Sequence, residues 1–477
     1  MADNPSLDFE KNVYKALSDT QLRENLRFAM DNFILKRKSI FPDEDETENL
    51  RELGYSIKRR ALSKLPELLE QLEKKCLQNG IQVHWAETTD EANQTVLDIL
   101  RSHNATRLVK GKSMVSEEMQ LNSFLRDHGI EALETDLGEF IIQLNNETPS
   151  HIIVPAIHKN KAEIADIFHK KIPDTPYTED VEELNGIARR LLRQKFYNAQ
   201  VGLSGVNFAV AETGTLCLVE NEGNGRMCTT VPPVHIALMG LEKVIEKLTD
   251  LPPLLRLLVG SATGQLITTY VNMITSPRKT GEKDGPMEVH LIILDNGRSK
   301  IYAEPRYRQT LHCIRCGTCL NHCPVYTRIG GHAYGFVYPG PIGKILNPQV
   351  EGLKKAGMLA TASSLCLACE EVCPVKIPIT DILRSLRNSI NMSYNVDSLG
   401  AYSRFKNYWL EHIAWKLWRL MNIHPRIFAI GRKILGLLGL KMPKIGPLKN
   451  WTTCRTSPVL ASKSLPELAR QQGVDNE

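Results

Sequence analysis

The sequence predicts an α/β domain built on a parallel sheet, followed by a smaller cysteine-rich domain. The first observation behind this prediction is that short β-branched runs alternate with helical segments between about residues 60 and 300, as in parallel sheets covered by helices. The second is that seven of the 11 cysteines gather between His312 and Pro378. A length of 477 residues suits two or three domains, and an apolar share of 42% is that of a globular protein.

The chain divides by its residue pattern into four parts. Residues 1–60 are charged and helical in pattern, and we predict an N-terminal helical arm there. Residues 61–300 form the predicted α/β domain, and residues 301–395 form the cysteine-rich domain. Residues 396–477 are predicted to be a basic helical extension with a polar tail.

Within residues 61–300, the elements follow from periodicity and from turn residues. Helical patterns predict helices over 64–78, 87–101 and 116–128, and a buried helix over 251–274. Apolar, β-branched runs predict strands over 81–86, 107–111, 131–136, 151–156, 235–240 and 290–295. Two further runs flank Glu212, Thr213 and Gly214, which predicts a hairpin.

Two cysteine motifs carry the clearest chemistry in the chain. The first reads C-x2-C-x2-C-x3-C-P and supplies Cys313, Cys316, Cys319 and Cys323. This spacing is typical of cubane iron–sulfur clusters, in which three thiolates surround one cluster and the fourth ligates its neighbour. The second motif supplies Cys366, Cys369 and Cys373. Ser363 stands where its first cysteine would be.

Because the last cysteine of each motif points away from its own cluster, the predicted wiring is crossed. The first [4Fe–4S] cluster is predicted to bind Cys313, Cys316, Cys319 and Cys373. The second is predicted to bind Cys323, Cys366 and Cys369. Its fourth ligand stays open. Ser363, a water, another residue or a substrate atom can fill the position, or the site can hold a [3Fe–4S] cluster.

Other uses of these cysteines fit the pattern less well. Zinc sites lack the C-x3-C-P ending, and disulfides need an oxidising compartment, for which the sequence gives no sign. The remaining cysteines are scattered, and we expect small buried hydrophobic residues at Cys76, Cys217, Cys228 and Cys454. Between the motifs, the glycines and prolines of residues 328–348 argue against a regular helix and predict an ordered loop over the clusters.

A candidate ligand site lies in loops at the strand ends of the α/β domain, where such sheets bind their ligands. Lysine, arginine and free backbone N–H groups there suit a phosphate or a carboxylate. The candidate residues are Lys112, Glu212, Gly214, Asn221, Gly223 and Arg226. The alternative is that the glycines form tight turns and the charges are solvated. No phosphate-binding glycine motif is present, so no nucleotide is predicted.

The C-terminal part is strongly basic. Residues 401–449 hold ten Lys or Arg against one acid, Glu411, together with Trp409, Trp415 and Trp418. Basic, tryptophan-rich amphipathic helices favour membrane surfaces or acidic partners, so peripheral contact with the inner face of the cell membrane is one hypothesis. The other is that the tryptophans pack on their own domain.

The sequence also bounds where the protein works. The N-terminus has neither a basic start nor an apolar core, and no apolar run is long enough to span a membrane. We therefore expect a cytoplasmic protein. A net charge of +5 is small for this length and predicts no nucleic-acid partner.

These features together resemble the lactate utilization protein B (LutB) family of iron–sulfur proteins. The matching runs are KSMVSEE, ETDLGEFIIQL, PSHIIVPAIHK, NFAVAETGTLCLV, NEGNGRMCTT, DNGRS, CIRCGTCLNHCPVY, GPIG, SLCLACEEVCPVKIP and PLKNW. In the family, the N-terminal part is the LUD domain, an α/β fold similar to sugar-phosphate isomerases and cyclo-ligases. The cysteine part is similar to a helical ferredoxin-type domain. The family also shows three cysteines in its second motif.

The resemblance implies a role in oxidising L-lactate to pyruvate beside two partners, a second cysteine-rich redox subunit and a smaller LUD-domain protein. We expect the chain to pass electrons through its clusters toward a quinone or another carrier, and not to act as a stand-alone enzyme. Two alternatives stay open. In one, the LUD domain holds lactate and the chain is catalytic. In the other, the chain is a redox-sensing module that binds a metabolite.

Overall fold

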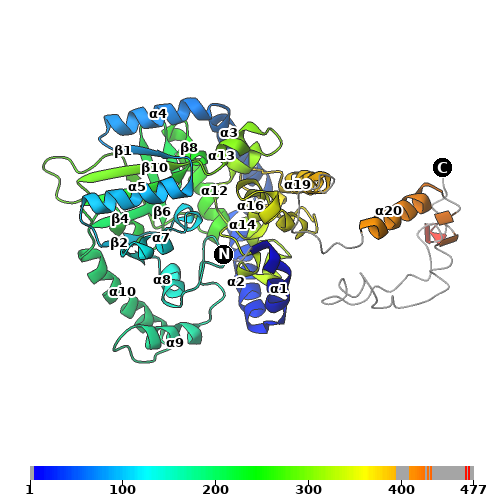
Figure 1. Cartoon of the computed structure of the whole chain (residues 1–477), viewed down its shortest axis with the longest axis horizontal. Helices are drawn as coiled ribbons and strands as arrows, with labels where there is room; N and C mark the ends of the chain where they lie inside the picture. The colour runs from blue at the N-terminus through cyan, green and yellow to red at the C-terminus, as the bar shows by residue number, and fades with distance from the viewer. Residues whose placement is uncertain are drawn as a thin grey trace. The chain divides into compact units, whose positions relative to one another are not determined.

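The structure of the protein is a computed structural model (Figure 1). It describes residues 5–393 and 408–424, with short pieces at 427–428, 430–431, 468–469 and 471–472. The chain divides into two compact units, Met1–Asp397 and Ser398–Glu477. The first unit contains two sheets and all seven motif cysteines.

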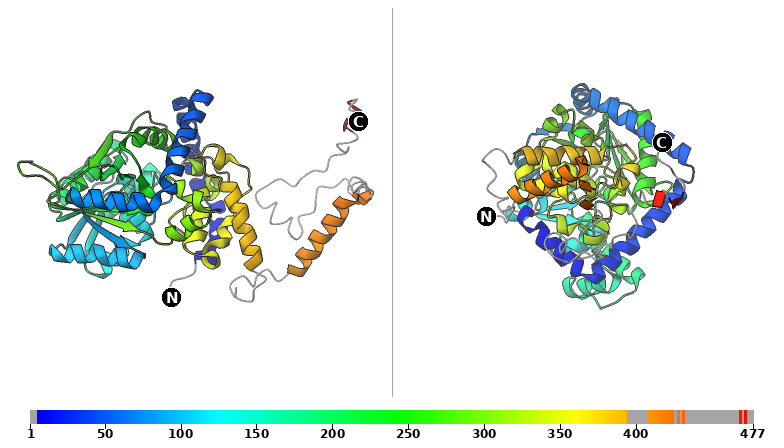
Figure 2. Two further views of the ribbon diagram at one scale, coloured as in Figure 1. Left: turned by 90° about the horizontal axis from the view of Figure 1, so that it is seen from above. Right: turned by 90° about the vertical axis from the view of Figure 1, so that its right-hand side faces the viewer.

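Four helices open the chain, namely α1 (Pro5–Ser18), α2 (Thr20–Ile40), α3 (Glu44–Ser63) and α4 (Leu65–Gln78). Asp19 and Asp43 cap α2 and α3, because each carboxylate accepts a backbone N–H group of the first turn. Helices α1 and α2 run beside the cysteine-rich segment, as both views in Figure 2 indicate. From residue 5 onward, the arm predicted over residues 1–60 is therefore helical, and it packs on the cysteine-rich part of the chain.

Six strands form an all-parallel sheet in the order β1-β10-β7-β4-β2-β3. They are β1 (Gln82–Ala86), β2 (Arg107–Lys110), β3 (Glu131–Glu134), β4 (Val201–Gly205), β7 (Val234–Gly240) and β10 (Glu288–Leu294). Along β7, Ile236 and Leu238 join the core beneath α5 (Thr89–Ser102), whereas Ala237 and Met239 join the core beneath α4. Both faces are buried, as in other parallel sheets covered by helices. The predicted α/β class is confirmed.

Five helices follow β2 and β3 along the chain and pack against that edge of the sheet. They are α6 (Met114–Glu118), α7 (Leu121–Asp127), α8 (Leu137–Leu144), α9 (Lys161–Lys171) and α10 (Val181–Tyr197). Phe140 of α8 and Phe168 of α9 pack edge to face beside Val109 of β2. This packing fixes the loop after β2, which carries the candidate site residue Lys112.

A smaller mixed sheet has the order β8-β5-β6-β9. Its strands are β5 (Phe208–Val210), β6 (Thr215–Glu220), β8 (Val244–Ile245) and β9 (Tyr270–Ile274). Strands β5 and β6 are antiparallel and form the predicted hairpin. Its turn needs Gly214, whose φ of 71° lies in the left-handed region. A short helix, α11 (Asn224–Cys228), follows β6, and α12 (Leu251–Thr263) follows β8.

Between β10 and residue 393 the chain is mainly helical and shares one core with the arm. The helices are α13 (Arg298–Ala303), α14 (Thr318–Asn321), α15 (Tyr326–Ile329), α16 (Gly340–Val350), α17 (Leu353–Ala356), α18 (Ala368–Glu371) and α19 (Ile379–Ser393). Leu26 of α2, Phe208 of β5 and Leu254 of α12 belong to the same hydrophobic cluster as Cys319 and Leu383. The described residues of the cysteine-rich part therefore share their core with the arm and the hairpin.

Three predicted elements differ in the structure. Residues 151–156 form turns and bends in place of a strand. The helix predicted over 116–128 is broken into α6 and α7 at Gln120, whose φ of 52° is left-handed and cannot continue a helix. The helix predicted over 251–274 ends at Thr263, because Gly264 adopts a left-handed C-cap, and β9 follows.

The loop predicted over residues 328–348 is also helical in its second half. Helix α16 begins at Gly340, so Pro341 lies in the first turn, where a helix needs no backbone N–H donor. Pro348 lies near the C-terminal end of the same helix. The first half of the segment has the predicted irregular form, with a short α15 and a single 3₁₀ turn at His332–Tyr334.

The second unit is described mainly by α20 (Tyr408–Ile423). Trp415 and Trp418 are exposed on it, with their rings edge to face at 5.7 Å. Among the residues that the structure describes, no helix combines the length and the apolar character needed to cross a membrane. Much of the basic stretch predicted over 401–449 lies outside the described residues, as does Cys454. Cys76, Cys217 and Cys228 are buried as predicted.

Candidate iron–sulfur centre

The two cysteine motifs have the same backbone. Arg315 follows Cys313 by two residues with a φ of 63°, and Leu365 occupies the matching place in the second motif with a φ of 56°. Gly317 (φ 75°) and Leu367 (φ 67°) both start a short helix from a left-handed N-cap. Left-handed leucine residues are rare and strained. The second motif therefore adopts the turn of the first, although Leu367 stands where the first motif has Gly317.

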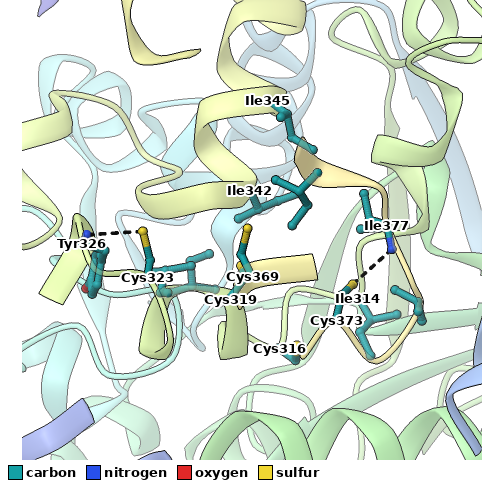
Figure 3. Close-up of a cluster of buried hydrophobic side chains, with 14 of the residues drawn as sticks. Ile314, Cys316, Cys319, Cys323, Tyr326, Ile342, Ile345, Cys369, Cys373 and Ile377 are labelled. Carbon is teal, nitrogen blue, oxygen red and sulfur yellow. Dashed lines mark hydrogen bonds between the residues drawn. The ribbon is translucent and has the colours of Figure 1, made fainter. Parts of the chain in front are cut away.

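Four motif cysteines line one small pocket. The cysteines that line it are Cys313, Cys316, Cys319 and Cys373, and its other walls are mostly isoleucine and valine. The backbone N–H of Arg315 donates to Cys313 Sγ (3.4 Å), and that of Ile377 donates to Cys373 Sγ (3.3 Å; Figure 3). These are the residues predicted for the first cluster, including the cysteine from the second motif.

The other three cysteines form a second group. Cys323 and Cys366 are the thiol neighbours that raise the pKa of Cys369 beyond the effect of its burial, to about 12. In Figure 3 the sulfur atoms of Cys323 and Cys369 point to the same side. Cys323 Sγ accepts from the backbone N–H of Tyr326 and from Lys344 Nζ, each at 3.5 Å. Unlike the first group, this one reaches the surface, since Cys366 is exposed.

The two groups fit the clusters that their spacing predicts. Burial raises the pKa of Cys316 and Cys319 far above the ordinary thiol value, and that of Cys373 to about 11. Such thiols stay protonated unless a metal replaces the proton. N–H groups aimed at sulfur are also the donors that stabilise the negative charge of bound clusters. Cys369 of the second group is close enough to Cys319 of the first to raise the pKa of its thiol, which places the two groups side by side.

The six residues of the predicted anion site do not lie together. Lys112 and Asn221 line one pocket, and Gly223 and Arg226 line a second pocket beside it. Glu212 lies apart from both and accepts the backbone N–H of Leu248 (2.9 Å). Gly214 lies against α4, where a Cβ atom would come within 2.9 Å of Lys75. The hairpin turn therefore packs on a helix, and the site predicted across all six residues is divided.

The pocket that contains Lys112 lies at the carboxyl ends of the parallel strands, the usual ligand position in such sheets. It has a volume of about 370 Å³, enough for a small molecule. Besides Lys112, two buried cations line it, Lys243 after β7 and Arg315 from the first cysteine motif. Sequence reasoning missed both. The position of Lys243, shortly after an apolar strand that ends at Gly240, was the signal that could have found it.

Buried ion pairs join this pocket to the cysteine motif. Arg315 pairs with Glu242 (3.2 Å), and Glu242 also pairs with Arg298 (2.7 Å). Arg298 in turn pairs with Glu118 (2.8 Å). Burial alone would raise the pKa of Glu242, but Arg298 and Arg315 hold it down at about 2. The guanidinium of Arg315 also lies over the ring of Tyr338, 4.7 Å from its centroid. Arg315 and its ion pairs therefore connect the pocket to the first cysteine group.

Family models match three parts of the chain. Residues 69–294 match the LUD domain, and residues 309–377 match a 4Fe-4S dicluster domain. Residues 398–474 match the C-terminal domain of lactate utilisation protein B. The dicluster match covers both cysteine motifs, in agreement with the iron–sulfur chemistry that their spacing predicts.

Curated relatives match the chain over nearly its whole length. Lactate utilization protein B of Shouchella clausii is 40% identical, covering 95% of each chain. Lactate utilization protein B of Bacillus velezensis and the uncharacterized electron transport protein YkgF of Escherichia coli K12 are each 39% identical, covering 94% of each chain. At this identity and coverage, the chain belongs to the lactate utilization protein B family.

Proposed function

We propose that this protein is the electron-transfer component of a multi-protein system that oxidises L-lactate to pyruvate. The observation that carries the proposal is the placement of the seven motif cysteines in two adjacent groups. One group lies beside the pocket of the α/β domain, with three buried cysteines and the half-buried Cys313, and the other reaches the surface at Cys366. Bound [4Fe–4S] clusters accept one electron at a time, so two of them can take the electron pair that leaves lactate.

The burial of the two groups gives the relay a direction. The first group is walled by apolar side chains and by Arg315, which also lines the pocket. The second group has an exposed cysteine and an exposed neighbour, Leu367, with 47% of its surface accessible. An acceptor of electrons needs close approach to the outer cluster. We therefore place electron exit toward a quinone or another carrier at the surface around Leu367.

The names of the relatives and the family resemblance supply the substrate and the partners of the proposal. Relatives at about 40% identity are called lactate utilization protein B, and one is called an electron transport protein. The resemblance adds a second cysteine-rich redox subunit and a smaller LUD-domain protein. In this assignment the chain is not a stand-alone enzyme, and lactate loses its electrons on a partner.

A second candidate function is catalytic, and the pocket favours it. Lys112, Lys243 and Arg315 offer cationic groups to a carboxylate, and Arg315 lies between two cysteines of the first group. A 2-hydroxy acid in this pocket would lie next to the first cluster. In that case the isolated chain binds L-lactate or pyruvate, and Lys112→Met weakens binding by about tenfold or more, because the carboxylate loses a part-buried charge partner. Lys195→Met, at an exposed ion pair, is the control.

Anaerobic reduction separates the two candidates. The full chain with intact clusters is mixed with L-lactate, alone and then with both partners, and cluster reduction is followed by visible bleaching and low-temperature EPR. The proposal expects reduction only when the partners are present. Reduction of the isolated chain favours the catalytic candidate, and no reduction in either mixture contradicts both.

Two cysteine variants sharpen this test. Cys369→Ala removes a cysteine of the second group, whereas Cys76→Ala changes a buried cysteine remote from the motifs. With partners and lactate present, the first variant should still reduce its first cluster but lose transfer to an added quinone. The control should keep both steps.

A further inference from the structure

The second cysteine group lacks one cysteine, and the structure places a hydroxyl group where that thiol would be. Ser363 is the counterpart of Cys313, as Cys366 is of Cys316 and Cys369 is of Cys319. Pro374 likewise matches Pro324. The question is whether the Ser363 side chain is directed as the Cys313 side chain is, or only shares its place in the sequence.

The hydrogen bonds of the two side chains are the same. Cys313 Sγ accepts the backbone N–H two residues ahead, from Arg315, at 3.4 Å. Ser363 Oγ accepts the backbone N–H two residues ahead, from Leu365, at 3.2 Å. Both donor residues are left-handed, with φ values of 63° and 56°. The Ser363 oxygen therefore occupies the position of the first ligand in its turn.

The backbone of this turn is held by a dedicated contact. Arg387 of α19 donates from Nη2 to the carbonyl of Ser363 (2.7 Å) and from Nε to the carbonyl of Ala360 (2.8 Å). The backbone N–H of Ser363 donates to the carbonyl of Thr361 (2.8 Å). A planar guanidinium that bridges two carbonyls fixes both distance and direction. Ser363 is therefore positioned before any cluster binds.

We propose that Ser363 Oγ is the fourth ligand of the second cluster, beside Cys323, Cys366 and Cys369. This inference rests on the proposed two-cluster function and completes its second site as a four-iron cluster. When the Fe–O bond forms, the hydroxyl proton leaves to water, and the oxidation state of the iron does not change. Half-burial of Ser363 beside the exposed Cys366 gives that proton a path to solvent.

An oxygen ligand sets the properties of the outer cluster. Alkoxide is a harder donor than thiolate and favours the more oxidised iron, so it lowers the reduction potential of its cluster. The cluster nearest the surface would then be the stronger reductant once it is reduced. This suits a site that delivers electrons to an external carrier.

Three variants test the assignment on the full chain, reconstituted anaerobically. Ser363→Ala removes the ligand, Ser363→Cys restores the four-cysteine motif, and Ser364→Ala changes the exposed neighbouring serine as a control. The measurements are iron and sulfide per chain, EPR after mild oxidation, and the two reduction potentials. None of them requires lactate.

The proposal expects the wild type and Ser364→Ala to keep two four-iron clusters. Ser363→Ala should lose iron from one cluster and show a [3Fe–4S]⁺ signal, and Ser363→Cys should raise the potential of that cluster alone. A wild type that already holds a three-iron cluster would overturn the assignment. So would a Ser363→Ala protein that keeps the iron content and both potentials of the wild type.

The outcome is separable from the proposed function. Suppose that the Ser363 variants behave as expected while lactate and the partners fail to reduce the wild-type protein. In that case the proposed electron-transfer function is wrong and the assignment of Ser363 as a ligand stands. If lactate reduction succeeds while the Ser363 variants change nothing, the function stands and the ligand assignment fails. If Ser363→Ala does not fold, the potential of Ser363→Cys decides the question.

Discussion

At the scale of the residue, Lys344 shows how the protein tunes its second cysteine group. Its side chain is only 1% exposed, donates to Cys323 Sγ at 3.5 Å, and lies 5.6 Å from the ring centroid of Tyr334. A buried ammonium is costly unless negative charge lies beside it. A ligated Cys323 thiolate supplies that charge, so a bound second cluster would stabilise the buried ammonium of Lys344.

Removal of this charge should make the second cluster harder to reduce. We expect Lys344→Met to lower the reduction potential of the second cluster and to leave the first unchanged, because a nearby positive charge favours the reduced cluster. Redox titration followed by EPR measures both values. Lys355→Met, which loses only an exposed pair with Glu351, is the control. Equal potentials in the Lys344 variant and the wild type would contradict this role.

His235 in the central strand β7 should make the protein sensitive to acid. Burial, aided by the neighbouring His290, lowers the pKa of His235 to about 3, whereas an unfolded histidine has a pKa near 6.5. The folded state therefore keeps this histidine neutral. Its contribution to stability is complete above about pH 6.5 and is lost as the pH falls toward 3, by about 2 kcal/mol at pH 5.

Thermal unfolding at pH 7 and at pH 5 tests this contribution. The fall in Tm between the two pH values should be smaller in His235→Gln than in the wild type, because glutamine has no proton to gain. His128→Gln, at an exposed site, should keep the wild-type difference. An unchanged pH dependence in the His235 variant would show that the histidine titrates normally in the folded protein.

The sequence predicted the residues whose spacing is local and missed those brought together by the fold. The seven motif cysteines lie within two short turns. The structure brings Cys373 to the first motif and Cys323 to Cys369, while their ligation of two clusters stays a prediction. Lys243 and Arg315 meet Lys112 only because β2, β7 and the first motif converge on one pocket. Glu212 lies far from it, since its hairpin turn packs elsewhere. No local pattern encodes those distances.

At the scale of the element, the contact between the loops at Ser150 and Gly331 joins the α/β domain to the cysteine-rich part. A Cβ atom on Gly331 would lie 1.9 Å from the carbonyl oxygen of Ser150. The hydroxyl of Tyr326 also donates to that carbonyl (2.7 Å). Backbone at this distance cannot move aside as a flexible side chain can. The junction therefore depends on glycine for space.

Gly331→Ala should destabilise the protein by about 2–3 kcal/mol, the upper part of the range for overpacking, because backbone must shift. Gly186→Ala in α10 is a matched control, since its Cβ would meet only the mobile end of Arg190 at 3.4 Å. Alanine in that helix should be neutral or stabilising. Chemical unfolding of the three proteins measures the difference, and equal stability of Gly331→Ala and the wild type would show that the junction yields easily.

The sequence predicts a helix or strand correctly where apolar residues are spaced by burial in that element. It fails where apolar residues line a pocket or a domain contact instead. The run at 151–156 has the composition of a strand, yet Ile152 lines the pocket of the first cysteine group, and Ile153 and Val154 line the larger pocket. Its hydrophobicity serves the junction between domains. The glycines and prolines of residues 328–348 argue against a helix and so hide α16, in which Pro341 lies in the first turn, where proline is tolerated.

At the scale of the whole molecule, the cluster sites are part of the core that holds the first unit together. Cys316, Cys319, Cys323, Cys369 and Cys373 belong to one hydrophobic cluster that also includes side chains of the arm and the hairpin. Ligand bonds there constrain helices from distant parts of the chain. Stability and cluster content should therefore be coupled, as in proteins whose metal sites contribute folding free energy.

Loss of the clusters should destabilise residues of the α/β domain as well as the cysteine motifs. We expect cluster-free protein to unfold at a Tm lower by on the order of 10 °C, as follows for a loss of several kcal/mol in a unit of this size. Far-UV circular dichroism measures the Tm, and backbone hydrogen exchange of β1 reports on the α/β domain. If β1 exchanges at the same rate with and without clusters, the shared core does not couple the two parts.

The crossed arrangement of the cysteines is the central claim, and paired variants test it most directly. Low-temperature EPR of the reduced protein is compared for Cys313→Ser, Cys373→Ser, Cys323→Ser and Cys366→Ser. Crossed ligation predicts that the first two variants alter the same cluster signal and that the last two alter the other. If Cys373→Ser instead alters the signal changed by Cys366→Ser, each motif ligates its own cluster, and the account is wrong.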